Sequence, residues 1–321
     1  MNYRKMPHGD TFSYLTADKL KSEHFAVPLL CAAVYILNAL LVILFKTVEA
    51  DAITAYTLMA IAEIIAVGLP AVVFMKLRNR DNTGRVGFSA DKISVIILSS
   101  VAMTFGAMAI GMLFDHIGLL ENSGATYNTL RLPELENRLA PMLYATVTFA
   151  AVPALCEEFL CRNIIYGEYE KYGNIAAIIV SGVSFALLHF SLGKLPMYLF
   201  CGFMLGFLRM ITNSSIATFF AHFLYNAFAL FYYKFFGALS EQLSEFTLVF
   251  FILLFLFLLC FSLMMGESAR LFRSYEAKSR LALFTYEEKQ IYSTRQGLLA
   301  YISSPALWLS FILFVIFSLI L

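Results

Sequence analysis

The chain has 321 residues, of which 60% are apolar and only 14% are charged, and its formal net charge is +1. A soluble domain carries about 25% charged residues, so this composition excludes an ordinary soluble enzyme. The near-zero net charge also excludes a nucleic-acid binder, which needs a basic surface. The five cysteines form no C-x-x-C pair, so neither a zinc finger nor a disulfide framework is expected.

Long apolar runs predict an all-α, polytopic membrane protein with one domain, residues 1–321, and about eight or nine transmembrane helices. A helix needs about 20 mainly apolar residues to cross a hydrocarbon core about 30 Å thick. In chain order, the expected spans are Phe25–Phe45, Ile53–Met75, Ile93–Phe114, Leu139 to beyond Glu157, Asn174–Leu192, Pro196–Met210, Ser215–Tyr233, Phe246–Met265 and Ile302–Leu321.

The distribution of lysine and arginine predicts the orientation of these spans. With the N-terminus inside, the inner segments collect 18 of the 23 Lys and Arg residues. Such an excess of positive charge is typical of cytoplasmic segments. We therefore predict a cytoplasmic N-terminus and a cytoplasmic polar segment at residues 267–299.

Three ionisable residues on three different spans are predicted to lie at one depth. Glu157 lies sixteen residues before Gly173, and His189 lies sixteen residues after it, so a helical hairpin turning at Gly173 places them at matched height. His222 lies eight residues into a later span that enters from the same side. At about 1.5 Å per residue, all three lie roughly 12–15 Å below the inner surface. An ionisable group at the centre of a span costs about 2.5–3.5 kcal/mol, so this grouping points to function.

Spacing within the fourth span separates the two neighbouring acids. Glu158 and Arg162 are four residues apart with the acid first, the favourable order for an ion pair on one helix face. Glu157 points about 100° away and has no such partner. A structural role is therefore favoured for Glu158 and Arg162, and Glu157 remains available for chemistry.

The same four-residue spacing recurs in two later spans. Phe185 and His189 share a helix face, so an aromatic side chain is expected beside the imidazole. His222 and Asn226 also share a face, although alone each reads as a core residue or as a polar contact between helices. Glu63 lies in the middle of the second span, either in a site or as a hydrogen-bonded buried acid.

Three motifs in this order resemble the CPBP family of CAAX proteases and bacteriocin-processing enzymes, also called Abi. They are E-E-x-x-x-R at 157–162, F-x-x-x-H at 185–189 and H-x-x-x-N at 222–226. Each motif alone is weak, but the ordered set is specific. The resemblance covers residues 139–236, the predicted catalytic core formed by spans four to seven.

The resemblance implies an intramembrane endopeptidase that uses an activated water molecule. In this interpretation Glu157 is the general base, and His189 helps to hold the water. His222 and Asn226 stabilise the oxyanion, a contribution that typically changes the rate about a hundred- to a thousand-fold per donor. The supporting residues are Glu158, Arg162 and Phe185.

Several alternatives remain open at this stage. No cofactor is favoured, but Glu157, His189 and His222 offer two imidazoles and one carboxylate, which is a possible zinc set with an open fourth position. Two alternatives belong to other classes of protein: an ion-coupled transporter, and a non-catalytic immunity or scaffold protein. The absence of an internal repeat and the clustering of polar residues at one depth argue against a transporter.

The resemblance also limits the partners. It implies a membrane-associated peptide or protein as substrate, either of the CAAX type or from bacteriocin or pheromone processing. The lipid bilayer is the other partner, and no nucleic acid is expected. The general character of the chain resembles bacterial members of the family, which predicts a location in the cell membrane.

Overall fold

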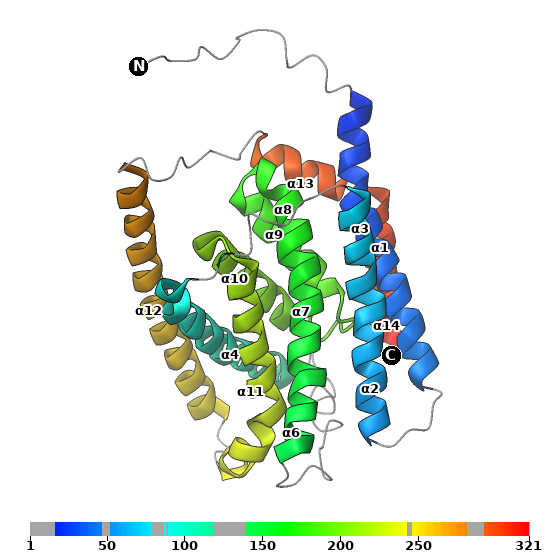
Figure 1. Cartoon of the computed structure of the whole chain (residues 1–321). Coiled ribbons are helices and arrows are strands. Elements are labelled where there is room, and N and C mark those ends of the chain that lie inside the picture. Colours follow the sequence, from blue (N-terminus) through cyan, green and yellow to red (C-terminus); the bar gives the residue numbers. More distant parts are fainter. Residues whose placement is uncertain are drawn as a thin grey trace.

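The described residues of the computed structural model are almost all helical (Figure 1). The structure describes residues 17–46, 52–78, 87, 89–117, 139–242, 246–280 and 292–320. No strand occurs among these residues, and the predicted all-α, polytopic membrane fold is confirmed.

The N-terminal part supplies three membrane-crossing segments. The second of them is continuous and contains a π-helical segment, η1. The elements are α1 (Ala17–Lys46), α2 (Ala52–Glu63), η1 (Ile64–Gly68), α3 (Leu69–Leu77), the 3-10 turn η2 (Ala90–Lys92) and α4 (Ile93–His116).

The central part begins with a long helical segment that carries both acids of the first motif. Its pieces are α6 (Leu139–Ala145), the π-helical η4 (Thr146–Ala151), α7 (Val152–Glu158), the π-helical η5 (Phe159–Ile165), α8 (Tyr166–Tyr169) and the 3-10 turn η6 (Glu170–Tyr172). The chain then reverses at Gly173, whose φ of 93° favours glycine, and continues as α9 (Asn174–Leu187). The predicted hairpin about Gly173 is therefore present.

The remaining helices complete the bundle. They are α10 (Leu195–Thr212), α11 (Ser215–Gln242), α12 (Phe246–Arg280), α13 (Thr294–Ile302) and α14 (Pro305–Ile320). Asn213, with a left-handed φ of 46°, reverses the chain between α10 and α11. Asparagine tolerates this conformation better than most residues.

Each of the nine predicted spans contains helix. By length and composition alone, six segments of the described residues are long and apolar enough to cross a membrane. A seventh is obtained if α13 and α14, bent by 59°, count as one span. Two shorter apolar helices, Asn174–Leu187 and Ser215–Phe231, correspond to the fifth and seventh predicted spans.

Three predicted boundaries were wrong. The fifth span was expected to reach Leu192, but α9 ends at Leu187, because the apolar sequence continues through a turn in which Phe190 has a φ of 43°. The last span begins at Pro305 rather than Ile302, after the bend. The helix of the eighth span continues beyond Met265 to Arg280, so the start of segment 267–299 is helical, whereas residues 281–291 lie outside the described residues.

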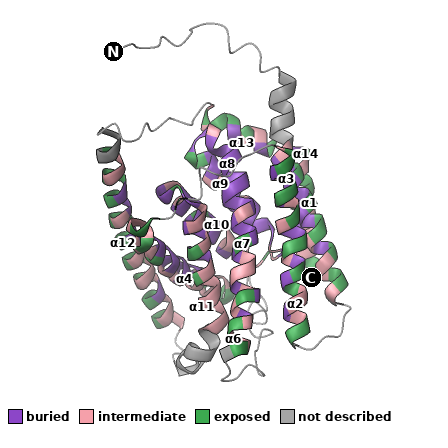
Figure 2. Cartoon of the chain, viewed as in Figure 1, coloured by how far each residue is buried: buried purple, intermediate pink, exposed green. Residues whose placement is uncertain are grey.

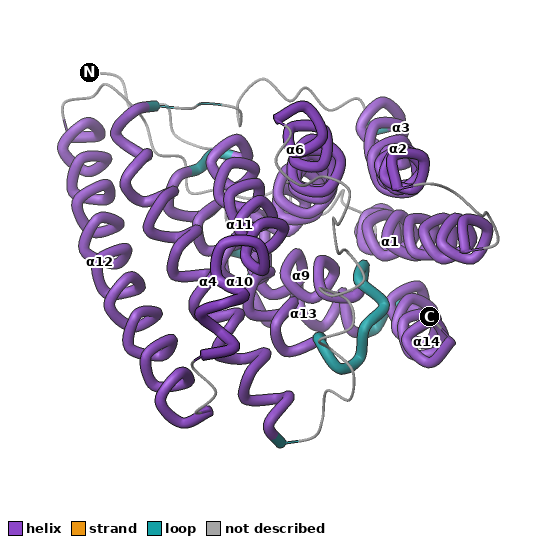
Figure 3. The backbone as a smooth tube through the Cα atoms, turned by 90° about the horizontal axis from the view of Figure 1, so that it is seen from below, coloured by secondary structure: helices purple, strands orange, loops and turns teal. Residues whose placement is uncertain are grey.

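The motif-bearing helices lie in the interior of the bundle. Viewed along the bundle, α9 and α10 are central, with α12, α6, α1 and α14 around them (Figure 3). The buried residues follow the same distribution, because the surfaces of α7, α9 and α10 are mostly buried (Figure 2). In α12, only 11% of the membrane-spanning window is buried, as expected for a helix that faces lipid.

Candidate active site

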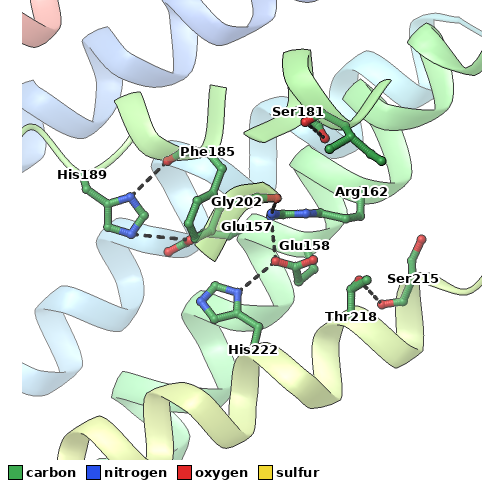
Figure 4. A network of polar contacts seen from close by, with 11 residues as sticks. Glu157, Glu158, Arg162, Ser181, Phe185, His189, Gly202, Ser215, Thr218 and His222 are labelled. Carbon is green, nitrogen blue, oxygen red and sulfur yellow. Dashed lines mark hydrogen bonds and ion pairs between the residues drawn. The ribbon is translucent and has the colours of Figure 1, made fainter. Parts of the chain in front are cut away.

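Glu157 and His189 face each other across the hairpin (Figure 4). Glu157 is the next-to-last residue of α7, and His189 lies two residues beyond the end of α9. The distance from Glu157 Oε2 to His189 Nε2 is 3.8 Å. This close approach agrees with the matched height that the hairpin predicts. The location of His189 differs from the prediction, because it lies in a turn and not inside a helix.

The imidazole of His189 has a defined orientation. Its Nδ1 lies 3.0 Å from the carbonyl oxygen of Phe185, and a carbonyl oxygen only accepts hydrogen bonds. Nδ1 therefore carries the proton, and in the neutral ring Nε2 is an acceptor that faces Glu157. The Phe185 ring lies 4.9 Å from the imidazole, centroid to centroid, so the predicted aromatic contact is present.

Glu158 is the centre of a second polar group, whose members come from α7, η5 and α11. Arg162 Nη1 donates to Glu158 Oε1 at 2.8 Å, so the ion pair predicted from spacing is present. His222 Nδ1 lies 2.9 Å from the same carboxylate oxygen, a contact that spacing along one helix does not predict. The common depth predicted for His222 and for Glu157, the neighbour of Glu158, was the one sequence signal for it.

Arg162 is fully buried and is held on three sides. In addition to Glu158, its Nη2 donates to the carbonyl oxygen of Gly202 at 3.0 Å, and its guanidinium lies 4.6 Å from the centre of the Phe185 ring. A buried charge in a membrane protein needs such partners. Arg162 therefore joins α10 to the hairpin, and Phe185 connects the two polar groups.

The site's third motif begins at His222 and ends at Asn226, one turn further along α11. His222 is buried and Asn226 is half-buried. The packing of α11 against α7 and η5 brings this motif to the acids. The elements that carry the sequence-predicted residues therefore pack together.

Glu63, at the end of α2, belongs to the surroundings of Glu157. The two carboxyl groups lie close enough for their charges to repel each other. Oxygen Oε1 of Glu63 is buried and has no hydrogen-bond partner among the described residues. The segment that follows it, η1, packs on α7 so closely that a Cβ on Gly68 would lie 3.2 Å from Cys156 Sγ.

The residues of the possible zinc set are not grouped around one point in this structure. Within the part of the chain that the structure describes, no three His, Cys, Asp or Glu side chains are arranged to hold a metal ion. His189 faces Glu157, whereas Nδ1 of His222 faces Glu158. The donors thus form two separate pairs, which does not fit one centre with two imidazoles and one carboxylate.

Comparison with known proteins supports the resemblance seen in the motifs. Residues 139–228 match the model of the family described as type II CAAX prenyl endopeptidase Rce1-like. The match spans under a third of the chain but includes all three motifs, and it lies within the predicted core of residues 139–236. No curated protein and no solved structure matches the chain. The match points to a protease that acts on membrane-associated substrates in a multi-pass membrane protein.

Proposed function

We propose that the protein is an intramembrane endopeptidase of the CAAX type, in which Glu157 activates a water molecule for attack on a peptide bond. The observation that carries this proposal is the opposed pair of Glu157 and His189, with Oε2 and Nε2 at 3.8 Å. This distance is too long for a direct hydrogen bond, but both atoms can bind the same water molecule.

The hydrogen-bonding capacity of the pair suits a nucleophilic water. The Glu157 carboxylate and His189 Nε2 are both acceptors, so one water can donate a hydrogen to each. Its lone pairs then remain available for the peptide carbonyl. When the carbon–oxygen bond forms, Glu157 takes one proton and can return it to the leaving amine, the function of a general base and acid.

The oxyanion requires hydrogen-bond donors, and these are assigned to α11. The amide of Asn226 is a donor in every protonation state. His222 contributes through Nε2 only when its ring carries two protons, because Nδ1 is engaged with Glu158. We therefore assign the main oxyanion contact to Asn226 and a charge-assisted contact to His222.

The mechanism requires no metal, and none of its steps passes through one. It follows that cleavage by the purified protein should persist after treatment with a strong zinc chelator. Loss of cleavage on chelation, with recovery on added zinc, would instead favour the zinc-dependent form of the same protease.

The proposal is tested by mapping new N- and C-termini in membrane fractions. Cells carrying the wild-type protein are compared with cells carrying Glu157→Gln at equal expression. The control is Glu276→Gln, the same change at an exposed acid near the end of α12. Termini that vanish with Glu157→Gln and persist with Glu276→Gln establish proteolysis and identify the substrate class. Identical termini in all three strains would leave a transporter or a non-catalytic scaffold as the better interpretation.

A further inference from the structure

His189 is positioned without the help of a helical backbone. The helix that precedes it, α9, ends at Leu187, and the residue after it, Phe190, has a left-handed φ of 43°. A residue in such a turn is not restrained by a continuous ladder of backbone hydrogen bonds. Besides the bond from Nδ1 to the Phe185 carbonyl, its side chain is held by contacts from elsewhere in the fold.

One such contact is an aromatic stack with Tyr198, in the first part of α10. The His189 and Tyr198 rings are nearly parallel, with an interplanar angle of 22° and a centroid distance of 3.8 Å. Phe185 contacts the same imidazole at 4.9 Å. Contacts of this kind are worth about 0.5–1.5 kcal/mol each and restrict the plane of the ring.

The backbone of the turn is held by α1, which lies outside the matched residues 139–228. Asn38 Nδ2 donates to the carbonyl oxygen of Leu188 at 3.2 Å, and the Tyr35 hydroxyl donates to that of Ser184 at 2.8 Å. The last carbonyls of a helix have no partner within the helix. Inside a bilayer such groups need donors from the protein, and α1 provides two.

From these contacts we infer that Tyr198 and Asn38 are positioning residues that keep the imidazole of His189 in one plane and one tautomer. The inference rests on the proposed function, in which Nε2 of His189 accepts a hydrogen bond from the water. If the turn shifts, the bond from Nδ1 to the Phe185 carbonyl is lost and the proton can move to Nε2. Nε2 then donates instead of accepting, and the water loses its second acceptor.

The first experiment measures the tautomer directly by nitrogen-15 NMR of histidine-labelled protein in detergent micelles. The signal of His189 is identified by its absence from the spectrum of His189→Gln. The wild type should show a proton on Nδ1, whereas Asn38→Leu and Tyr198→Met should show a mixture or a proton on Nε2. Tyr198→Phe keeps the ring and should resemble the wild type. Leu192→Ala, at an exposed position three residues after His189, is the matched control.

The second experiment measures cleavage of the substrate identified by terminus mapping. Misplacement of a catalytic group by about 1 Å can lower a rate about a hundred-fold. We expect Tyr198→Met and Asn38→Leu to lower kcat about ten- to a hundred-fold, with little change in KM or unfolding temperature. Tyr198→Phe, which keeps the ring, should retain most of the wild-type kcat.

The two experiments separate the inference from the proposed function. An unchanged tautomer in both Tyr198→Met and Asn38→Leu would overturn the inference, even if the wild type is a protease. Equal loss in Tyr198→Phe and Tyr198→Met would also overturn it, because the hydroxyl and not the ring would then be needed. A shifted tautomer in a protein that cleaves nothing would uphold the positioning and refute the proposed function.

Discussion

Two acid–imidazole pairs lie side by side in this protein, and their surroundings differ. In the first pair, the Glu157 and His189 side chains are 11% and 20% exposed, and their nearest polar atoms are 3.8 Å apart. In the second, the Glu158 and His222 side chains are 2% and 4% exposed and lie 2.9 Å apart. The first pair therefore has access for a water molecule, and the second is sealed.

The two acids also differ in the charges nearest to them. The guanidinium of Arg162 neutralises Glu158 at 2.8 Å, whereas Glu157 lies close to the like charges of Glu63 and Glu158. Two adjacent residues of the same type thus have opposite electrostatic surroundings. We interpret Glu158, the acid of the sealed pair, as a support of the site and the open pair as its reactive part.

Glu157→Gln should reduce cleavage more than any other substitution. It keeps the shape of the side chain but removes the base, so we expect cleavage to fall about a hundred- to ten-thousand-fold. The unfolding temperature in detergent should change little, because Glu157 has no close neutralising partner. Cleavage rates with the mapped substrate, measured beside Glu276→Gln, provide the test. Normal turnover by Glu157→Gln would refute the mechanism.

Substitution in the sealed pair should have the reverse signature. Glu158→Gln leaves the fully buried Arg162 without a counter-charge, and breaking such a pair typically costs about 3–5 kcal/mol. We expect a clearly lower unfolding temperature in detergent and a matching loss of folded protein in membranes.

Arg162→Gln tests the same ion pair from the other side. It also removes the donor to the Gly202 carbonyl oxygen and the contact with Phe185. It should destabilise the protein at least as much as Glu158→Gln. If both variants were as stable as the wild type and equally inactive, Glu158 and Arg162 would have a direct catalytic role, and their interpretation as supports would be wrong.

Asn226→Ala tests whether the helix of the sealed pair also serves the chemistry. Removal of one oxyanion donor typically lowers kcat about a hundred- to a thousand-fold. KM should remain close to that of the wild type, because the contact forms mainly in the transition state. A loss confined to KM would indicate that Asn226 binds the substrate in its ground state.

The sequence predicted those features that depend on local spacing. Apolar length predicted the helices, the polar stretch before Gly173 predicted the hairpin, and the four-residue spacing predicted the ion pair of Glu158 with Arg162. It did not predict that α9 ends at Leu187, because the hydropathy of the following turn is that of a helix. Contacts between distant elements, such as Asn38 with Leu188, leave no periodic signal in a single sequence.

The smallest expected effect concerns the contact between α9 and α10 that supports the sealed pair. The helices approach so closely that a Cβ on Gly202 would lie 2.7 Å from the carbonyl oxygen of Gly182. Gly202→Ala must separate them, and overpacking of this kind typically costs about 1–3 kcal/mol. The shift also moves the carbonyl oxygen that accepts from Arg162, so stability should fall more than cleavage per folded molecule.

Gly266→Ala, in α12, is the matched control, because a Cβ there meets nothing within 4 Å. Within a helix this change is neutral or stabilising by up to about 1 kcal/mol. If both glycine variants unfolded at the wild-type temperature, the close approach of α9 and α10 would not be needed to hold Arg162. Glu158 and Phe185 would then be sufficient to hold Arg162.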